Sequence, residues 1–434
     1  MKPRILIAIH YMHLGGAEIS LIGLLQALDP NKVDIDLFVY SHEGELMKLI
    51  PEYINVLPEI PAYKMFERPM KEVLKKGHLS VFFARIKAKM RMKSYLKKKQ
   101  TIDKSAIMGF LGEEVSKVVP DINPSVEYDL AISFLTPHNF VRDHVRAKKK
   151  ICWIHTDYTR IDVNAELELP VWDSFDYVAS ISSDVTKTFL QVFPTLAPKI
   201  IEIENILSST FVRHRAEEFE VDWNKIGGGN CLRILSIGRF SEQKNFDNLP
   251  FICSLLIEEM KKILSIGRFC EAKNYDSVPD ITRRIIESGC DIKWYIIGFG
   301  ADENLIRQKI AEAGMQEHVI ILGKKANPYP YIKACDIYVQ PSRYEGKSVT
   351  VREAQMLCKP VVVTNYPTAS SQIKNGDDGV IVPLDNEECA KGLVEFILDT
   401  EKQNHIIEYL KAHDYGNVEE VEKIYDILKK QITI

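Results

Sequence analysis

The sequence predicts an α/β protein built from two parallel-sheet domains joined by a link. Three observations lead to this prediction. Short apolar runs rich in β-branched residues alternate with helix-like segments, which is the pattern of βαβ units. The alternation stops at a glycine-rich stretch, "KIGGGN" at 225–230, and then restarts. With 434 residues, the chain is also longer than one hydrophobic core ordinarily supports.

The first series of strands and helices occupies residues 1–205. The apolar run "RILIAIH" leads through "LGGAE" into the helix-like "ISLIGLLQALD" and then the strand-like "VDIDLFVY". Four further strand-like runs follow, each bounded by polar turns: "YDLAISF", "KKICWIH", "FDYVASIS" and "KIIEIENI". We expect these strands to form one parallel sheet.

The second series occupies residues 231–415, after a link at 206–230. Its strand-like runs are "LRILSIG", "IKWYIIG", "HVIILG", "DIYVQPS" and "KPVVVTN". Helix-like segments separate them, as the crossover connections of a parallel sheet require. The end of the chain, 416–434, is an amphipathic helical segment that we expect to cross back to the N-terminal domain.

Composition excludes several classes of protein. Hydrophobic residues make up 46% of the chain and charged residues 27%, as in a globular protein, and the net charge of −4 gives no general attraction to nucleic acid. The eight cysteines are scattered without a CxxC pair, which favours reduced thiols over disulfides or a zinc site. No apolar run approaches the ~18 residues that a bilayer crossing needs. We therefore expect a cytoplasmic protein, or one held on the inner face of a membrane.

One segment departs from the rhythm of strands and helices. Residues 64–104 carry fourteen Lys or Arg and three Asp or Glu, a local net charge of +11 that leaves −15 for the rest of the chain (−4 − 11). Phe, Ile, Met, Tyr and Leu are interleaved with the cations. Two interpretations remain open: a solvated helical insertion, or a basic amphipathic surface that meets anionic lipid. A nucleic-acid groove would need more such patches.

A stretch of the second series occurs twice. "ILSIGRFSEQKNFDNLP" at 234–250 returns as "ILSIGRFCEAKNYDSVP" at 263–279, with twelve of seventeen positions identical. Each copy reads as a strand, a turn with an arginine and a lysine, and the start of a helix. The predicted C-terminal domain therefore contains a duplicated strand–helix unit.

The cations of the repeat suit a phosphate site. An arginine can grip phosphate oxygens in two places, and a lysine five residues later adds a point charge. The pair is Arg239 with Lys244 in the first copy and Arg268 with Lys273 in the second.

The second copy is the better candidate for the working one. It runs through a complete helix directly into the strand "WYIIGFG", as a βα unit should. We therefore expect the second copy in the central strand and the first copy at an edge or looped out, with Arg239 and Lys244 as the alternative pair. A duplication that the fold merely tolerates is the other interpretation.

The stretch "PSRYEGKSVTVREAQ", 341–355, carries two acids at the end of a strand and the start of a helix. Glu345 and Glu353 are eight residues apart, which along a helix covers ~12 Å, about the reach from the sugar to the ribose of a nucleotide sugar. The backbone N–H groups of residues 346–350 would form an unpaired helix start that binds a diphosphate. A capping acid followed by a surface glutamate would give the same spacing.

Taken in order, six motifs resemble those of glycosyltransferase family 4, and the resemblance covers most of the chain. They are "LGGAE" at 14–18, "WIHTD" at 153–157, "IENI" at 203–206, the "GRF" repeat with its "KN", "IIGFG" at 296–300, and the two glutamates with seven residues between them. The resemblance implies a GT-B fold, in which two Rossmann-like domains face each other across a cleft. The N-terminal domain, 1–205, would bind the acceptor, and the C-terminal domain, 231–415, would bind the nucleotide sugar.

The resemblance also implies roles for individual residues. Glu345 would hold hydroxyls of the donor sugar and Glu353 those of the ribose, while His155 would lie near the transferred sugar. A buried histidine bonded to backbone is the other interpretation of His155. The implied catalytic residues are His155, Arg268, Lys273 and Glu345. The implied donor-binding residues are Gly15, Gly16, Gly298, Gly300, Gly346, Lys347, Ser348, Val349 and Glu353.

The expected chemistry uses neither a metal nor a cofactor. Departure of a nucleoside diphosphate leaves negative charge on two phosphates, and fixed cations and N–H dipoles can neutralise it. The one Asp-x-Asp in the sequence, at 34–36, lies inside the strand-like run "VDIDLFVY", and the sequence has no cluster of His and Asp.

The resemblance thus implies a retaining glycosyltransferase that moves a hexose from a nucleotide sugar, which we expect to be UDP-linked. The acceptor would be a carbohydrate or a lipid-linked sugar in surface polysaccharide or glycolipid synthesis. Two alternatives stay open: an epimerase or phosphorylase with the same fold, or an inactive nucleotide- or lipid-binding remnant.

Overall fold

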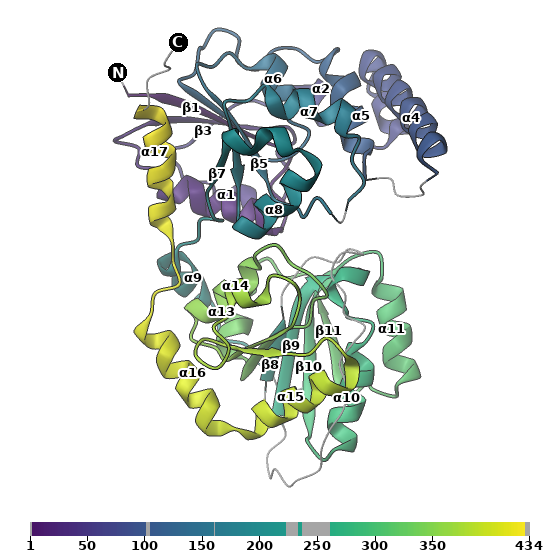
Figure 1. Cartoon of the computed structure of the whole chain (residues 1–434), viewed down its shortest axis with the longest axis vertical. Coiled ribbons are helices and arrows are strands. Elements are labelled where there is room, and N and C mark those ends of the chain that lie inside the picture. The colour runs from purple at the N-terminus through teal and green to yellow at the C-terminus, as the bar shows by residue number, and fades with distance from the viewer. Residues whose placement is uncertain (1, 101–104, 160, 223–232, 237–260, 430–434) are drawn as a thin grey trace. The chain divides into compact units, whose positions relative to one another are not determined.

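The computed structural model describes residues 2–100, 105–159, 161–222, 233–236 and 261–429 of the chain. The chain divides into two compact units: unit 1 comprises Met1–Leu207 with Val418–Ile434, and unit 2 comprises Ser208–Asn417. In each, helices pack around a sheet (Figure 1). The first helix within the predicted link, α9 (Ser209–Ala216), belongs to unit 2, and the last helical segment belongs to unit 1.

Unit 1 is built on a seven-stranded sheet in which all neighbouring strands are parallel, in the order β3-β2-β1-β4-β5-β6-β7. Helices cover the strands, which explains why a strand such as "RILIAI" reads as an almost continuous apolar run. The strands are β1 (Arg4–Ile9), β2 (Asp34–Val39), β3 (Asn55–Val56), β4 (Leu130–Ser133), β5 (Lys150–Ile154), β6 (Tyr177–Ser180) and β7 (Ile200–Glu202).

The helices of unit 1 connect these strands, and a helical insertion lies between β3 and β4. The α-helices are α1 (Gly16–Ala27), α2 (Pro61–Lys64), α3 (Met70–Lys75), α4 (Leu79–Lys99), α5 (Ile107–Ser116), α6 (Asn139–His144), α7 (Ala165–Asp173), α8 (Ser183–Val192) and α17 (Glu422–Lys429). The 3₁₀ helices are η1 (Glu45–Leu49), η2 (Pro194–Lys199) and η4 (Val418–Val421).

Close contacts fix the first and last helices of unit 1. A Cβ on Gly23 of α1 would lie 2.0 Å from the carbonyl oxygen of Ile206, so only glycine fits there. On α17, the Tyr425 hydroxyl accepts a hydrogen bond from the Asp29 amide at 2.6 Å. The C-terminal helix is thus part of the packing of unit 1.

The basic segment forms α3 and α4. Helix α4 contacts the rest of unit 1 both through apolar side chains and through ion pairs. Val81, Ala88 and Met92 are buried on one of its faces. Lys87 and Arg91 on α4 pair with the buried carboxylate of Glu114 on α5. These contacts attach one side of α4 to the rest of unit 1.

Unit 2 contains a second sheet with only parallel pairs, in the order β11-β10-β8-β12-β13-β14, and β9 also pairs with β10 and β12. The two sheets confirm the predicted fold class of two Rossmann-like parallel-sheet domains. The strands are β8 (Arg233–Ser236), β9 (Lys261–Arg268), β10 (Ile292–Phe299), β11 (Val319–Gly323), β12 (Ile337–Gln340), β13 (Val361–Thr364) and β14 (Val380–Val382).

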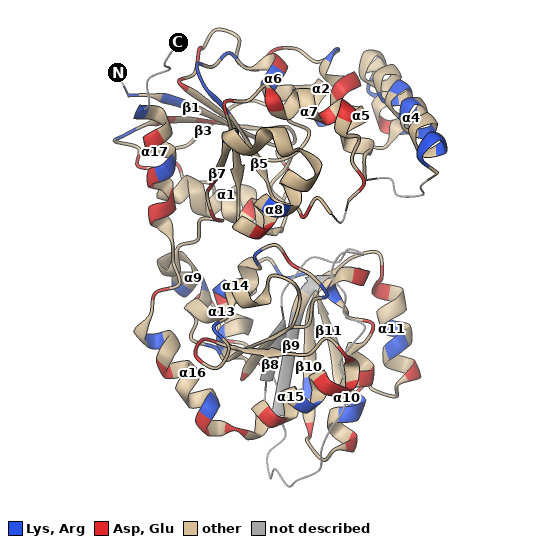
Figure 2. Ribbon diagram, in the orientation of Figure 1, with Lys and Arg blue, Asp and Glu red and all other residues tan. Residues whose placement is uncertain are grey.

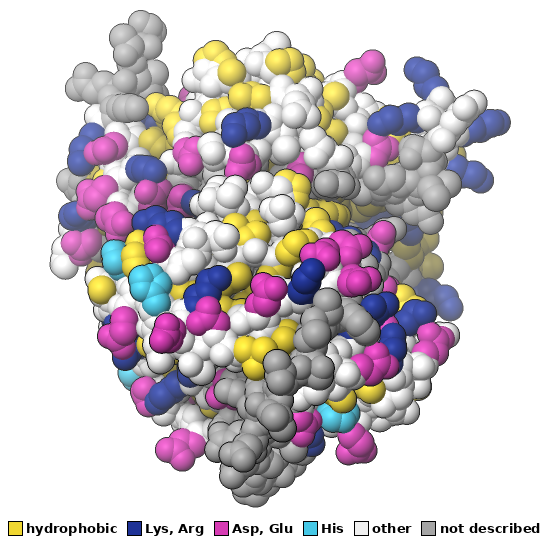
Figure 3. Space-filling view, turned by 60° about the horizontal axis from the view of Figure 1, so that its bottom comes forward, with side chains coloured by type: hydrophobic (Ala, Val, Ile, Leu, Met, Phe, Trp, Pro, Cys, Tyr) yellow, Lys and Arg dark blue, Asp and Glu magenta, His cyan; other side chains and the backbone are white. Residues whose placement is uncertain are grey.

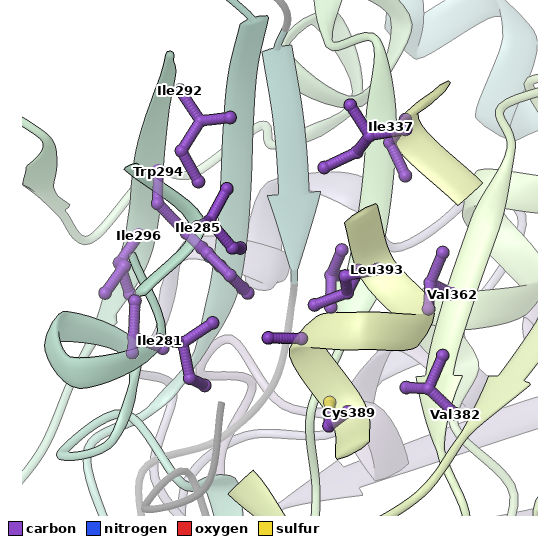
Figure 4. Packing of buried hydrophobic residues seen from close by; sticks show 14 of the residues in the cluster. Ile281, Ile285, Ile292, Trp294, Ile296, Ile337, Val362, Val382, Cys389 and Leu393 are labelled. Atoms are coloured by element: carbon purple, nitrogen blue, oxygen red, sulfur yellow. The ribbon is translucent and has the colours of Figure 1, made fainter. Parts of the chain in front are cut away.

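The core of unit 2 lies between this sheet and its helices. Ile281 and Ile285 on one face of α10 pack with Trp294 of β10 and Leu393 of α15, and all four are fully buried (Figure 4). Burying each such side chain contributes about 1.5–3 kcal/mol. The helices are η3 (Glu271–Lys273), α10 (Val278–Glu287), α11 (Glu303–Glu312), α12 (Tyr329–Ala334), α13 (Val349–Met356), α14 (Ala369–Gln372), α15 (Asn386–Leu398) and α16 (Thr400–Ala412).

The two copies of the repeat pair with the same neighbours. Arg233 of β8 and Lys262 of β9 are 29 positions apart, which is the repeat spacing, and both pair with Lys293. The next residue of each strand pairs with Ile337. The first copy's strand therefore does not lie at an edge of the sheet, contrary to one of our expectations. The rest of the first copy, including Arg239 and Lys244, lies outside the described residues.

Charges of both signs are mixed over the surface in view in Figure 3, and no broad field of one sign covers that face. Helix α4 differs from this pattern. Its 21 residues include eight Lys or Arg and no Asp or Glu, and it carries blue but no red in Figure 2. The positive excess found in the sequence is thus concentrated on one helix.

Candidate functional site

Two loops of unit 2 meet at the carboxyl edge of its sheet. One follows β9 and belongs to the second copy of the repeat, and the other follows β12 and carries the first glutamate. The Arg343 amide donates to the carbonyl of Ala272 at 3.3 Å, and the Asn274 side chain donates to the carbonyl of Pro341 at 3.4 Å. Ligands bind at this edge in open α/β sheets.

The repeated "KN" has a clear local role in the second copy. Asn274 has φ +61°, in the left-handed region that asparagine tolerates better than most residues. It ends the short helix η3 directly after Lys273, and α10 begins at Val278 with Pro279 in its first turn. The turn thereby directs the lysine toward the neighbouring loop.

A buried ion pair joins the two loops. Lys273 Nζ lies 2.6 Å from Glu345 Oε1, and each side chain is only 1% exposed. The same carboxylate oxygen accepts hydrogen bonds from Gln340 Nε2 at 2.9 Å and Ser342 Oγ at 2.8 Å. Two predicted residues 72 positions apart are therefore held in one fixed arrangement, in which the charge of each is compensated.

The start of α13 differs from the expected anion site. The helix begins at Val349, so Gly346 and Lys347 lie in the preceding loop. The Ser348 amide, expected to be unpaired, donates to Gln372 Oε1 at 2.9 Å. In return, Gln372 Nε2 donates to the Ser348 carbonyl at 2.6 Å. The prediction of an unpaired amide is wrong at Ser348, because a side chain 24 positions away satisfies it.

Glu353 lies inside α13, and Glu345 lies before it. Only part of the interval between them is therefore helical, and the ~12 Å helical rise does not apply. Glu353 is 2% exposed and accepts a hydrogen bond from the Tyr329 hydroxyl at 2.9 Å. Burial raises the pKa of Glu353 to about 8, although the Tyr329 hydrogen bond opposes the shift. The group is thus mostly protonated at neutral pH.

The glycines of "IIGFG" mark the end of β10. Gly298 pairs with Gly267, and Phe299 pairs with Arg268, the last residue of β9. Gly300 follows the strand. The backbone of Arg268 therefore lies at the same sheet edge as the loop that carries Lys273, and its side chain lies outside what the structure describes.

The remaining predicted residues belong to unit 1. Gly15 precedes α1 with φ −166°, an extended conformation open to any residue, and Gly16 is the first residue of the helix. His155 follows β5 and is half-buried. Its ring stacks on Trp153 with centroids 6.1 Å apart and contacts Phe134.

Sequence reasoning missed several partners of the predicted residues. Gln340 and Ser342 fix Glu345, and their position five and three residues before it in "QPSRYEG" is a signal that could have found them. Arg343 donates to the carbonyl of Glu271 at 3.1 Å, and burial lowers its pKa to about 9. Tyr329 gave no local signal, because it contacts Glu353 only through the packing of α12 on α13.

Sequence comparisons identify the family to which part of unit 2 is related. Residues 251–413 match the family described as "Glycosyl transferases group 1". The matched range contains the second copy of the repeat, the loop of Glu345 and helix α13, and it begins after the first copy.

Two relatives match over part of their length. The chain is 29% identical over 113 residues to the N-acetylgalactosamine-N,N'-diacetylbacillosaminyl-diphospho-undecaprenol 4-alpha-N-acetylgalactosaminyltransferase of Campylobacter jejuni, covering 26% of this chain and 31% of that one. It is 24% identical over 149 residues to the UDP-Gal:alpha-D-GlcNAc-diphosphoundecaprenol alpha-1,3-galactosyltransferase of Escherichia coli, covering 33% and 38%. The matches thus span about a third of the length of these relatives.

Comparison with solved structures extends to the whole chain. The crystal structure of Anabaena HepE in complex with UDP and glucose aligns with 98% of this chain and 99% of its own, at a TM-score of 0.64 and 15% identity. The fold is GT-B. Assignment to glycosyltransferase family 4 itself stays a prediction.

Proposed function

We propose that this protein is a retaining glycosyltransferase that transfers a hexose from a UDP-sugar to a carbohydrate or lipid-linked acceptor. The observation that carries the proposal is the buried Lys273–Glu345 pair, which joins the second repeat copy to the acidic loop at 2.6 Å. Both residues lie within the segment related to group 1 glycosyl transferases. The pair fixes both loops at the carboxyl edge of the sheet, where open α/β sheets bind ligands.

The donor end of the site is assigned residue by residue. Glu345 holds donor-sugar hydroxyls, with its orientation fixed by Gln340 and Ser342. Arg268 neutralises the departing diphosphate without a metal, and Lys273, whose charge Glu345 compensates in the free protein, acts beside it at the same sheet edge. Glu353 holds the ribose, and its protonated form would let it both donate and accept hydrogen bonds.

The names of two relatives support the proposed acceptor class. The names of the Campylobacter jejuni and Escherichia coli enzymes both specify a sugar carried on diphospho-undecaprenol. A lipid-linked acceptor of that kind would place this protein at a membrane surface in polysaccharide or glycolipid synthesis.

A donor screen tests the proposed activity. The full chain is incubated with UDP- and GDP-sugars, and release of UDP or GDP is measured together with the mass of any product. We expect release from at least one UDP-sugar. Folded protein that releases nucleotide from no donor would overturn the proposal, and UDP binding without turnover would point to a binding protein.

Membrane contact through α4 forms the second part of the proposed function. Leu79, Phe83 and Met90 lie on one face of the helix and are 51%, 64% and 67% exposed. Lys93 and Lys97 continue the same face, and neither has an ion pair with a described residue. An apolar stripe beside uncompensated lysines is complementary to anionic lipid, to which each cation contributes ~1 kcal/mol. No helix among the described residues has the length and hydropathy needed to span a bilayer.

Vesicle sedimentation tests this contact. We expect the protein to pellet with vesicles of phosphatidylcholine and phosphatidylglycerol, but not with phosphatidylcholine alone, and to be released by salt. The double substitution Phe83→Ser and Met90→Ser should reduce binding. Leu305→Ser, at a 41%-exposed position on α11, is the matched control and should not. Equal binding by all three proteins would exclude α4 as the contact surface.

A further inference from the structure

A cavity lies entirely within unit 1, at the carboxyl edge of its sheet. It has a volume of about 190 Å³ and is lined by residues that follow β1 and β2 and by residues 63–69 of the insertion. A water molecule takes up about 30 Å³, and pockets for drug-sized ligands measure about 300–1,000 Å³. The cavity is therefore suited to a single ring rather than a whole nucleotide sugar.

A histidine and a carboxylate form the polar centre of this cavity. His10 follows β1, is 5% exposed, and its Nδ1 lies 3.3 Å from Glu67 Oε1. Burial would raise the pKa of Glu67, but the hydrogen bond and charge of His10, together with the charges of Arg85 and Arg68, keep it below its usual value. Glu67 is thus an ionised acceptor facing His10 Nδ1. In the neutral ring a proton on Nδ1 leaves Nε2 as an acceptor.

Three buried polar atoms at the cavity have no hydrogen-bond partner among the described residues, and one of them, His13 Nδ1, lies 3.6 Å from Glu45 Oε2. The other two are Nε2 of His10 and the hydroxyl of Tyr40, which follows β2 and is 2% exposed. The two rings stack with centroids 5.0 Å apart and an interplanar angle of 23°. Buried polar atoms are nearly always bonded, so two neighbouring exceptions in one cavity indicate a bound group.

The insertion positions this polar centre. Arg85 of α4 is buried and donates to the carbonyls of Met65 at 2.7 Å and Arg68 at 2.6 Å. These bonds clamp the backbone on both sides of Glu67. Phe66, from the same loop, packs edge-on against the His10 ring at 5.7 Å. The helical insertion therefore builds one wall of the cavity in addition to carrying the basic surface.

The charges around the cavity favour a neutral ligand. Its charged lining residues are two cations and two anions: Lys64, Arg68, Glu43 and Glu67. Arg68 and Lys64 both pair with Glu43, and Lys64 also pairs with Glu59. No surplus positive charge remains for a phosphate. Aromatic walls with paired polar groups are typical of sites for hydroxyl-bearing rings.

We propose that this cavity binds one pyranose ring, with a ligand hydroxyl donating to His10 Nε2 and a second ligand oxygen bonding to the Tyr40 hydroxyl. The inference rests on the proposed function only where it identifies the bound ring as a sugar of the acceptor. His10 and Tyr40 are then specificity-determining residues, and neither belongs to the donor site.

Saturation-transfer NMR on the full chain tests the proposal. The probes are methyl α-glycosides of glucose, galactose, mannose, N-acetylglucosamine and N-acetylgalactosamine. We expect at least one to bind, and Tyr40→Phe and His10→Gln each to weaken it about tenfold through loss of one hydrogen bond. Tyr53→Phe is the matched control, because its hydroxyl bonds to the Leu25 carbonyl outside the cavity.

Two results would overturn the proposal. One is that no glycoside binds the wild-type protein, and the other is that Tyr40→Phe binds as tightly as the wild type. Tyr40→Phe keeps the ring and should fold even if His10→Gln does not. UDP binding measured on the same proteins separates this inference from the proposed activity. Glycoside binding without UDP binding would contradict the activity alone, and the reverse would contradict the cavity alone.

Discussion

The buried polar groups at the carboxyl edges of the two sheets differ in whether they are hydrogen-bonded within the protein. In unit 2, the Glu345 oxygen that pairs with Lys273 also accepts bonds from Gln340 and Ser342. In unit 1, His10 Nε2 and the Tyr40 hydroxyl are buried without a partner among the described residues. A network bonded within the protein fixes geometry, whereas unbonded atoms retain the capacity to bind a ligand. Substitutions in the bonded network of unit 2 should therefore lower the stability of the protein. Substitutions of the unbonded groups of unit 1 should mainly weaken ligand binding.

The largest effect on stability is expected at the buried ion pair. Lys273→Met would leave the Glu345 carboxylate buried without its counter-charge, and the free energy of unfolding should fall by about 3–5 kcal/mol. Urea unfolding of both proteins measures this change in the free energy of unfolding. Lys309→Met is the matched control, because Lys309 pairs with Glu312 at 2.8 Å on the surface and should cost under about 1 kcal/mol. Similar losses in both variants would contradict the difference between the edges.

Turnover should respond most strongly to the predicted catalytic groups. Arg268→Ala and Glu345→Ala should each lower turnover more than ~100-fold, because each removes a group that stabilises charge or orients the donor. Arg239→Ala should have little effect. Initial rates of UDP release measure all three. A reversed ranking of the two arginines would overturn our choice of the second copy.

A deletion sharpens the same test. Removing residues 234–262 takes out one repeat length and joins Arg233 directly to Ile263. Since residues of the two strands separated by the repeat spacing pair with the same neighbours, one strand should suffice for the sheet. We expect the shortened protein to fold and to keep its turnover. Loss of folding would show that both copies are needed.

The buried acid of α13 should make stability depend on pH. The pKa of Glu353 is about 8 in the folded protein, above its ordinary value of 4.5, so the folded state binds the proton more tightly. Its contribution to stability is complete below pH 4.5 and is lost as pH rises toward 8, by at most about 1.4 kcal/mol per pH unit. Glu353→Gln should remove this dependence. Thermal unfolding between pH 4.5 and 8 measures it, and identical pH profiles would contradict the assignment.

The smallest effect is expected at the unit 1 edge without ligand. Tyr40→Phe removes an unbonded hydroxyl, so the free energy of unfolding should change by less than about 0.5 kcal/mol. Tyr128→Phe is the matched control, because its buried hydroxyl donates to Asp36 at 2.6 Å and accepts from Asn123 at 2.7 Å. That variant should lose about 1–3 kcal/mol. A comparable loss at Tyr40 would mean that its hydroxyl is already bonded in the protein.

Much of the fold could be predicted from local pattern alone. Apolar runs such as "RILIAI" and "VVVT" are buried strands of parallel sheets, since burial on both faces leaves no place for polar residues. Residue types also identified Lys273 and Glu345 as candidates, because a phosphate and a sugar need such groups. The side chains of Arg268 and of the first repeat copy lie outside the described residues, so their roles stay predictions from the sequence.

The sequence by itself determined the two sheets, the alternation of strands and helices, and which residues carry chemistry. Only the tertiary structure decided how these residues are paired. Lys273 meets Glu345 across 72 positions, Gln372 takes the Ser348 amide across 24, and His10 meets Glu67 across 57. Periodicity reports which face of an element is buried, but not which element packs against it. Hydrogen-bond partners and pKa values depend on that packing, so they emerge only in the folded chain.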